Sequence, residues 1–402
     1  MADLNRAARF SSPQSQNRPC DVMIPQPKTD PTISSMLSER VDAGDFPSAV
    51  YLVAERGQAT FADALGDAVR EPENHAATLE TIYDLASLTK PLITGLLCGR
   101  LVELGELTLD SSISNYLLEF DRPDKSHITI RELLTHTSGL PAWRPLHLLA
   151  QGRPEGTLSA IANTPLDFKS GESVIYSDLG FIVLGYLLER LTGKRLDRLA
   201  AEEIFAPLNL SRTFFNPPAA LKRQIAASEN GAGYEREMCA KQFPEMVGGL
   251  AADSHAWRDG LIWGEVHDGN AHFLGGIAGH AGLFSDAGET FQLANQFLAG
   301  QTRILKPATG ALFNTDLTPG GDGARSFAWQ LASSPESSAG PSLPPDAFGH
   351  TGFTGTSCWI DPHLERVFIL LTNRTHARAL PFANINPVRR AFHTFAVNAM
   401  AV

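Results

Sequence analysis

Several features are scarce in this sequence of 402 residues, and each scarcity excludes a class of protein. No apolar run reaches the roughly 20 residues that a membrane-spanning helix needs, so we expect no membrane span. The 33 Lys and Arg residues form no basic run and are outnumbered by 44 Asp and Glu residues, which gives a net charge of −11. This balance argues against nucleic acid and anionic membrane surfaces as partners. The sequence also contains no internal repeat.

Cysteine is scarce as well. The four cysteines, Cys20, Cys98, Cys239 and Cys358, have neither metal-like nor redox-like spacing. Cys98 and Cys358 fall in apolar segments and are predicted to be buried free thiols, which fits a reducing compartment. The first 30 residues contain no apolar core of a secretory signal. We therefore expect the cytoplasm, with the periplasm as the alternative if the natural chain begins further upstream.

Apolar periodicity predicts strands near both chain ends and helices between them. Residues 1–30 are expected to form a poorly ordered tail. Helices are predicted at residues 30–43, 130–135, 178–191, 290–298 and 387–400. Strands are predicted at residues 48–55, 58–65, 327–331, 356–360 and 367–372. The stretch 333–345, rich in Ser, Pro and Gly, is predicted to be a surface loop.

This order of elements favours an α+β fold, an α/β sandwich in which an antiparallel β-sheet is flanked by helices and built from both chain ends. Residues 31–90 and 290–402 would form the sheet part of the domain. Residues 91–289 would form an inserted, mainly helical part. Hydrophobic residues make up 43% of the chain, enough for a large core.

Ser87-Leu88-Thr89-Lys90 places a nucleophile and a possible base one helical turn apart. Side chains at i and i+3 of a helix lie about 5–6 Å apart. Lys90 can then take the proton that Ser87 must lose to attack a carbonyl. Pro91 is tolerated only in the first turn of a helix, so the helix is predicted to begin near Ser87. The alternative is that Ser87 is an ordinary serine at the helix N-terminus and that the aliphatic part of Lys90 packs on apolar surface while its charge reaches solvent.

Tyr176-Ser177-Asp178 directly precedes a strongly apolar helix. A Tyr at such a junction can aim its hydroxyl into a cleft, and Asp178 can pair with a charge. The alternatives are a Tyr whose hydroxyl is hydrogen-bonded at the rim of the core and an Asp that caps the helix.

His350-Thr351-Gly352-Phe353 leads into a predicted strand. Gly352 permits a ligand to approach the backbone closely. The alternative is a Gly/Thr-rich bulge that carries no chemistry.

Together, Ser-x-x-Lys at 87–90, Tyr-x-Asp at 176–178 and His-Thr-Gly at 350–352 resemble the motifs of the serine β-lactamase and penicillin-binding superfamily. The resemblance is closest to its class C β-lactamase, esterase and D-aminopeptidase-like branch. It covers about residues 35–400 and includes the stretches 133–140 and 279–285. It implies a β-lactamase/transpeptidase-like fold and a serine hydrolase that forms an acyl-enzyme and needs neither cofactor nor metal.

The resemblance also implies residue roles. Ser87 would attack the carbonyl, while Lys90 and Tyr176 share the proton transfers, with the choice of base left open. The backbone N–H groups of Ser87 and Phe353 would form the oxyanion hole. The residues expected to contact substrate from the second and third motifs are Asp178, His350, Thr351 and Gly352. The substrate would be a small-molecule or peptide ester or amide.

Two residues depart from the motifs of this branch. Asp178 stands where Asn is usual, so it is expected to hold a substrate amide less well unless it turns to Lys90 instead. His350 stands where Lys is common and would supply a weaker, pH-dependent positive charge. Both changes favour an esterase or a peptidase/amidase. The alternatives are a β-lactamase or D,D-carboxypeptidase, an acyltransferase that uses the same acyl-enzyme, and a non-catalytic penicillin-binding module.

The segment 264–272, with His280 beyond it, is rich in His and Asp. Its spacing matches no metal motif, so we expect a loop that lines the cleft, with His267 or Asn270 contacting substrate. His136 and Ser138 belong to a stretch that is structural in the family and are not expected to form a second catalytic pair.

Overall fold

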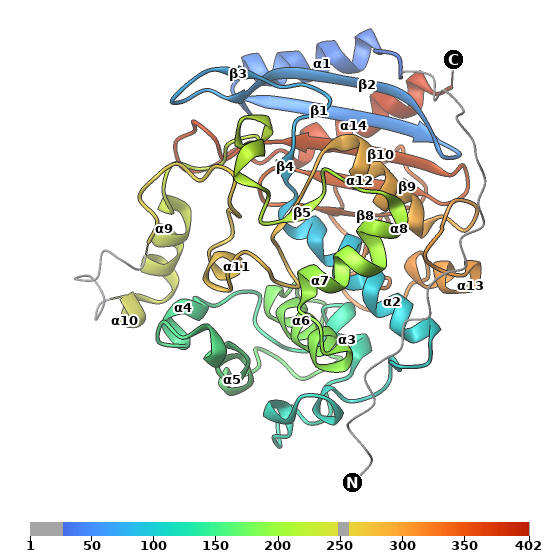
Figure 1. The fold of residues 1–402 in the computed structure, drawn as a ribbon. Helices are drawn as coiled ribbons and strands as arrows, with labels where there is room; N and C mark the ends of the chain where they lie inside the picture. The colour runs from blue at the N-terminus through green and yellow to red at the C-terminus, as the bar shows by residue number, and fades with distance from the viewer. Residues whose placement is uncertain (1–26, 248–256, 402) are drawn as a thin grey trace.

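A seven-stranded antiparallel sheet dominates the computed structural model, which describes residues 27–247 and 257–401 (Figure 1). Its strand order is β3-β2-β1-β10-β9-β8-β7. The strands are β1 (Ser48–Glu55), β2 (Gln58–Val69), β3 (His75–Ala76), β7 (Gln330–Leu331), β8 (Phe348–Thr351), β9 (Ser357–Asp361) and β10 (Arg366–Thr372). The two chain ends meet where β1 pairs with β10, so the prediction of one antiparallel sheet built from both ends is confirmed.

Side chains of β1 alternate between two hydrophobic cores, as expected for a strand buried on both faces. One core receives Ala49, Tyr51 and Val53 and lies under the helices α1 (Pro31–Asp42) and α14 (Asn386–Ala399). The larger core receives Val50, Leu52 and Ala54 and contains the central helices. Figure 1 shows α1 lying along the outer side of β1 and β2.

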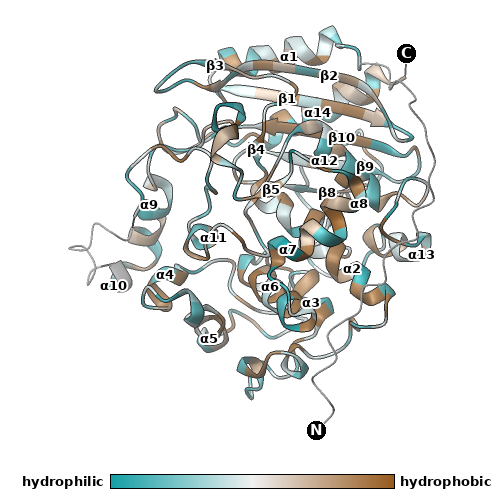
Figure 2. Ribbon diagram, in the orientation of Figure 1, coloured by the Kyte–Doolittle hydropathy of each residue, from teal (hydrophilic) through white to brown (hydrophobic). Residues whose placement is uncertain are grey.

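The predicted helices are all present, with ends shifted by a few residues. The Asp30 carboxylate accepts the N–H groups of Thr32 and Ile33 at the start of α1. The apolar helix predicted at 178–191 is α6 (Asp178–Thr192), which Figure 2 shows as largely hydrophobic. The remaining α-helices are α2 (Leu96–Glu103), α3 (Ile130–Leu134), α4 (Leu146–Leu149), α5 (Thr157–Asn163), α7 (Leu196–Ala200), α8 (Ala206–Leu208), α9 (Gly233–Gln242), α10 (Pro244–Val247), α11 (Gly269–Phe273), α12 (Ala287–Ala294) and α13 (Pro307–Gly310).

Two predictions near the C-terminal strands need correction. The strand expected at 327–331 is limited to Gln330–Leu331, because Ala328 has a positive φ of 67° that breaks the extended backbone. The loop at 333–345 is not purely superficial, since Ala339 and Leu343 are buried in the core beneath α14.

A second, three-stranded sheet went unpredicted because its strands are only two or three residues long. It consists of β4 (Tyr83–Asp84), β6 (Leu283–Ser285) and β5 (Phe214–Phe215), with β6 in the middle. The N–H of Leu85 donates to the carbonyl of Leu283. This sheet therefore fixes the backbone immediately before Ser87.

Cys98, Cys239 and Cys358 are buried free thiols, which confirms the prediction for Cys98 and Cys358. Cys20 and most of the predicted tail lie outside the described residues. Within 27–247 and 257–401, every helix is too short or too polar to traverse a bilayer.

Candidate active site

Ser87 lies in a tight turn rather than in a regular helix. Ala86, just before it, has a positive φ of 48°, and its N–H donates to the buried Asp84 carboxylate at 2.8 Å. A single 3₁₀ turn covers Ala86–Leu88, and a wider π-type turn, Lys90–Gly95, leads into α2. The helical run therefore begins at Ala86, which confirms the predicted start near Ser87, and it becomes a regular α-helix at Leu96. Within residues 81–90, Ser87 alone is not buried, so its hydroxyl is presented to the cleft.

Lys90 is completely buried behind Ser87 and is surrounded by oxygen atoms. Its Nζ lies 3.0 Å from Ser87 Oγ, 3.1 Å from the backbone carbonyl of His280 and 2.7 Å from Asp178 Oδ1. The Tyr176 ring centroid is 4.8 Å from Nζ. Burial alone lowers the pKa of Lys90, but the Asp178 carboxylate and the Tyr176 oxygen outweigh it and leave the pKa above its ordinary value.

Tyr176 and Asp178 reach the site from the start of α6. Ser177 is the cap, because its Oγ accepts the N–H of Gly180 at 3.2 Å. The alternative in which Asp178 caps the helix is therefore wrong, and its carboxylate is available to Lys90. Burial raises the pKa of Tyr176 to about 12, although Lys90 opposes this shift.

His136 supports the Tyr176 turn from behind. Its Nδ1 accepts the N–H of Ser177 at 3.0 Å, and its ring centroid lies 4.7 Å from that of Tyr176. Burial holds the pKa of His136 well below its usual range, so the ring is neutral. Ser138 is also buried, and its Oγ accepts the N–H of Leu140. Both residues lie beside the site rather than in the cavity walls.

His350, the second-last residue of β8, also lies against Tyr176, with ring centroids 5.7 Å apart. Its Nδ1 lies 2.8 Å from the Thr351 carbonyl, so this nitrogen carries the proton. Burial, reinforced by the nearby Lys90 and Arg325 cations, holds the pKa of His350 well below its usual range. The positive charge expected of His350 is therefore confined to pH values well below neutral, and at neutral pH the ring is an uncharged wall of the cleft.

Two cavities of opposite charge meet at Ser87. The larger one, about 510 Å³, is basic and the smaller one, about 200 Å³, is acidic. Residues common to both are Ser87, Tyr176, Tyr234 and Phe353. The larger cavity adds Arg325, His350, Thr351, Gly352, Arg374 and Arg389. The smaller one adds Trp143, Asp178, Glu235, His267 and Asp268.

The three arginines of the larger cavity differ in what they bind. Arg374 donates through Nε to the Phe353 carbonyl at 2.7 Å, and Arg389 donates to the Gly352 carbonyl at 3.1 Å. Both therefore hold the β8–β9 turn. In the described residues, the Arg325 guanidinium has no hydrogen bond or ion pair, and its burial lowers its pKa to about 10. Sequence analysis missed all three, since each is an isolated Arg outside any motif.

The two residues of the segment 264–272 that were expected to contact substrate, His267 and Asn270, have different outcomes. His267 lines the smaller cavity, and its Nε2 lies 2.9 Å from the Glu229 carboxylate. Asn270 does not: its Oδ1 accepts the N–H of Leu146 at 3.0 Å and its Nδ2 donates to the Arg144 carbonyl at 2.9 Å. With both polar atoms engaged and the residue buried, Asn270 braces a loop, and its predicted contact with substrate is corrected.

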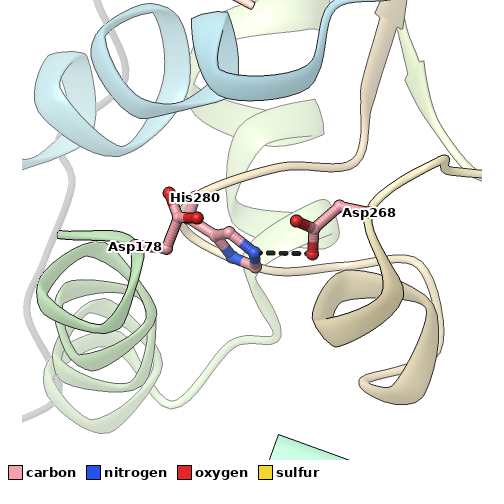
Figure 3. Close-up of side chains that lie close together, drawn as sticks. All are labelled: Asp178, Asp268 and His280. Carbon is pink, nitrogen blue, oxygen red and sulfur yellow. Dashed lines mark hydrogen bonds and ion pairs between the residues drawn. The ribbon is translucent and has the colours of Figure 1, made fainter. Parts of the chain in front are cut away.

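Asp178, Asp268 and His280 lie close enough together to suggest a metal site, with one ligand atom of each within 4.8 Å of the others (Figure 3). These groups already have partners, however. Asp268 Oδ1 lies 2.8 Å from His280 Nε2, and Asp178 faces Lys90. A dication here would lie beside a buried ammonium group, so the arrangement fits an internal charge network better than a metal site.

A serine beside a buried lysine and a tyrosine, next to an antiparallel sheet, is an arrangement typical of acyl-transferring serine enzymes. A family model described as Beta-lactamase matches residues 33–387. The chain therefore belongs to the Beta-lactamase family and is a serine hydrolase of the β-lactamase type.

The chain is similar to curated proteins over most of its length. An Escherichia coli K12 protein named "Putative D-alanyl-D-alanine carboxypeptidase" is 32% identical, with 85% of this chain and 81% of that protein aligned. A Bacillus subtilis N-acetylmuramyl-L-alanine amidase is 33% identical, with 86% and 80% aligned. Among solved structures, a class C β-lactamase aligns with a TM-score of 0.69 at 17% identity, covering 92% of this chain and 95% of that one. The structural match supports the fold.

Proposed function

We propose that the chain hydrolyses an ester or amide bond in a substrate that carries a free carboxylate close to the scissile bond. Ser87 attacks the carbonyl and forms the acyl-enzyme. In the enzyme form in which the Lys90–Tyr176 pair has lost one proton, this pair accepts the Ser87 proton and then gives it to the leaving group. The backbone N–H groups of Ser87 and Phe353, which line the same cleft, stabilise the oxyanion.

The observation that carries the substrate class is Arg325. Its guanidinium lines the larger cavity next to Ser87 and, among the described residues, has no counter-ion. A cation left without a partner in a partly buried position is stabilised by an anionic ligand, and Arg binds carboxylates through paired hydrogen bonds. Thr351 and Gly352 form the adjoining wall. His350 is neutral and adds no charge.

A D,D-carboxypeptidase is the second candidate, because Arg325 supplies the grip on a terminal carboxylate that His350 does not. An efficient β-lactamase is less well supported. Asp178 faces Lys90, so no side-chain amide stands ready for the substrate amide at this position. The names of the two relatives above also refer to bonds next to alanine, which fits a peptidase or amidase.

Paired substrates test this proposal. One pair is 3-carboxyphenyl acetate and phenyl acetate, and the other is N-acyl-D-Ala-D-Ala and its C-terminal amide. We expect kcat/KM to be at least tenfold higher for the carboxylate member, since a charged hydrogen bond contributes about 1.5–3 kcal/mol. Arg325→Gln should abolish this preference. Arg303→Gln, at an exposed arginine, is the matched control.

Loss of preference in Arg325→Gln but not in Arg303→Gln supports the carboxylate assignment, whereas no preference in the native protein refutes it. Ser87→Ala should remove acylation by a fluorophosphonate probe, and labelling that persists would refute the nucleophile. Fast nitrocefin hydrolysis would favour the β-lactamase alternative. Accelerated turnover in the presence of an alcohol, with formation of the new ester, would favour the acyltransferase.

We also propose a cytoplasmic location, supported by the free thiols Cys98, Cys239 and Cys358. Cell fractionation with compartment markers tests it.

A further inference from the structure

The ammonium group of Lys90 has at least as many close oxygen atoms around it as it has protons, the Tyr176 oxygen included. Ser87 Oγ, the His280 carbonyl and Asp178 Oδ1 lie within 3.1 Å of Nζ. A neutral amine has two N–H groups and must aim its lone pair at Ser87 to take a proton. The observed geometry instead suits a cation that donates to Ser87 Oγ and the His280 carbonyl and forms an ion pair with Asp178 Oδ1. Asp178 provides the only full negative charge among these three atoms.

Charged and titratable groups face Lys90 from every element around it. Tyr176 and Asp178 come from the start of α6, and the Asp268–His280 pair comes from the loop before β6 (Figure 3). The groups on the remaining sides are His136 after α3 and His350 on β8, and Arg325 before β7 acts on these two histidines and on Tyr176. Burial keeps both histidines neutral, so Asp178 is the anion that directly faces Lys90, while Asp268 lies nearby and is paired with His280.

We propose that Asp178 is a positioning residue that holds Lys90 as an ammonium ion against Ser87, rather than a residue that contacts the substrate. This inference rests on the proposed function, because it assigns Asp178 a place in the same reaction. The carboxylate replaces an amide that would be neutral at this position, and it acts on both candidate bases. It stabilises the cationic form of Lys90 and disfavours the phenolate form of Tyr176, so both bases hold their protons more tightly.

The sign of the pH effect follows from these two interactions. Removing the Asp178 charge leaves Lys90 buried with less compensation, so its pKa falls. Removing the same charge also lowers the pKa of Tyr176, which the carboxylate raises. The acid limb of kcat/KM reports the base of the free enzyme. Asp178→Asn should therefore move that limb to lower pH, whichever of the two residues receives the proton.

The experiment measures the lysine directly as well as the rate. The chain contains eight lysines, so protein labelled with ¹³C at lysine Cε gives a simple spectrum, and Lys90→Arg identifies the Lys90 signal. In Asp178→Asn we expect Lys90 to titrate at least about one pH unit lower than in the native protein, a typical effect of losing an opposite charge at this range. The acid limb of kcat/KM on phenyl acetate should move in the same direction.

Two further variants make the result specific. Asp197→Asn removes a carboxylate from the first turn of another helix, where it pairs with Arg195 outside the site, and should leave the Lys90 titration unchanged. Asp178→Glu retains the charge and should keep the native limb. Thermal melting of each variant confirms that it is folded.

Three results would overturn the inference. An unshifted Lys90 titration would show that Asp178 does not control the lysine. A raised KM with an unmoved acid limb would make Asp178 a substrate contact. Loss of activity by more than about 1000-fold, with no acid limb left, would make Asp178 the proton acceptor itself. The Lys90 titration is readable without turnover, so it still tests Asp178 if Ser87→Ala refutes the proposed function.

Discussion

Asp84 Oδ1 accepts the backbone N–H of Ala86 at 2.8 Å, directly before Ser87. The other oxygen, Oδ2, accepts the N–H of His267 at 2.7 Å. One buried carboxylate thus joins the strained turn before Ser87 to the wall of the smaller cavity. Burial raises the pKa of this carboxyl, and the two N–H groups partly offset the effect. Asp84 belongs to no motif, yet it sets where Ser87 points.

Asp84→Asn tests this coupling. The amide can accept from only one of the two N–H groups and presents its own NH₂ to the other. An N–H left buried without an acceptor costs about 1–3 kcal/mol, and displacement of a reacting group by about 1 Å can cost roughly 100-fold in rate. We expect a lower melting temperature and a fall of about that size in kcat on phenyl acetate. Asp110→Asn, at an exposed ion pair with Arg131, is the control and should behave like the native protein.

Gly352 controls the opposite side of the cleft. A Cβ there would lie 2.1 Å from Thr356 Oγ1 and 2.6 Å from the carbonyl oxygen of Leu85, two residues before Ser87. Gly352→Ala should therefore push the β8–β9 turn and its Phe353 N–H away from the nucleophile. We predict a loss of about 100- to 1000-fold in kcat, the range for losing one oxyanion donor.

Gly310→Ala provides the comparison for this substitution, because a Cβ at Gly310 meets nothing within 4 Å. It should retain native activity. Native activity in Gly352→Ala as well would show that Phe353 is not held by this turn.

Sequence patterns predicted the parts of the fold that are encoded locally. The short apolar run at 48–55 is β1, which is buried on both faces, and Asp30-Pro31 marks the start of α1. The strands of the second sheet are too short for any such period. Tertiary packing determines where these short strands form, and it also imposes the positive φ at Ala328 that shortens β7.

The same division applies to the site. The spacing of Ser87 and Lys90 predicted their contact, because both lie on one turn of the chain. Arg325 could not be predicted from the sequence, because only folding brings it to the cleft. Ser177 and Asp178 are both good caps, and the choice between them depends on Lys90, which is distant in sequence.

Glu235 should make stability fall as the pH rises. Burial, and then the charge of Asp268, raise the pKa of Glu235 to about 7, from 4.5 for an exposed carboxyl. At pH values between these two, the unfolded chain releases a proton that the folded protein keeps. Raising the pH through this range therefore lowers the free energy of unfolding by up to about 3 kcal/mol. Glu235→Gln removes this titration. We expect its melting temperature, relative to the native protein, to be higher at pH 8 than at pH 5.

The exposed Glu237, which pairs with Lys241 on the same helix α9, gives the control variant Glu237→Gln. A relative melting temperature that does not change with pH in Glu235→Gln would show that Glu235 is ionised in the folded protein throughout this range.

His393, which lies far from the cleft, should make the stability of the protein fall as the pH falls. It is completely buried on α14, and its Nδ1 donates to the Ala339 carbonyl at 2.8 Å. Burial lowers the pKa of His393 to about 4. Its contribution to stability is therefore complete above about pH 6.5 and is lost as the pH falls through 4, by roughly 3 kcal/mol. His393→Phe keeps a ring of similar size against Trp359 and Phe368 but cannot titrate.

At pH 7 the Phe variant should be the less stable protein, because the Ala339 carbonyl loses its donor. The deficit should shrink or reverse at pH 4, since only the native protein must then protonate a buried ring. Urea unfolding at both pH values measures the two free energies, with His127→Phe at an exposed position as the control. A deficit of equal size at both pH values would mean that His393 does not contribute to acid unfolding.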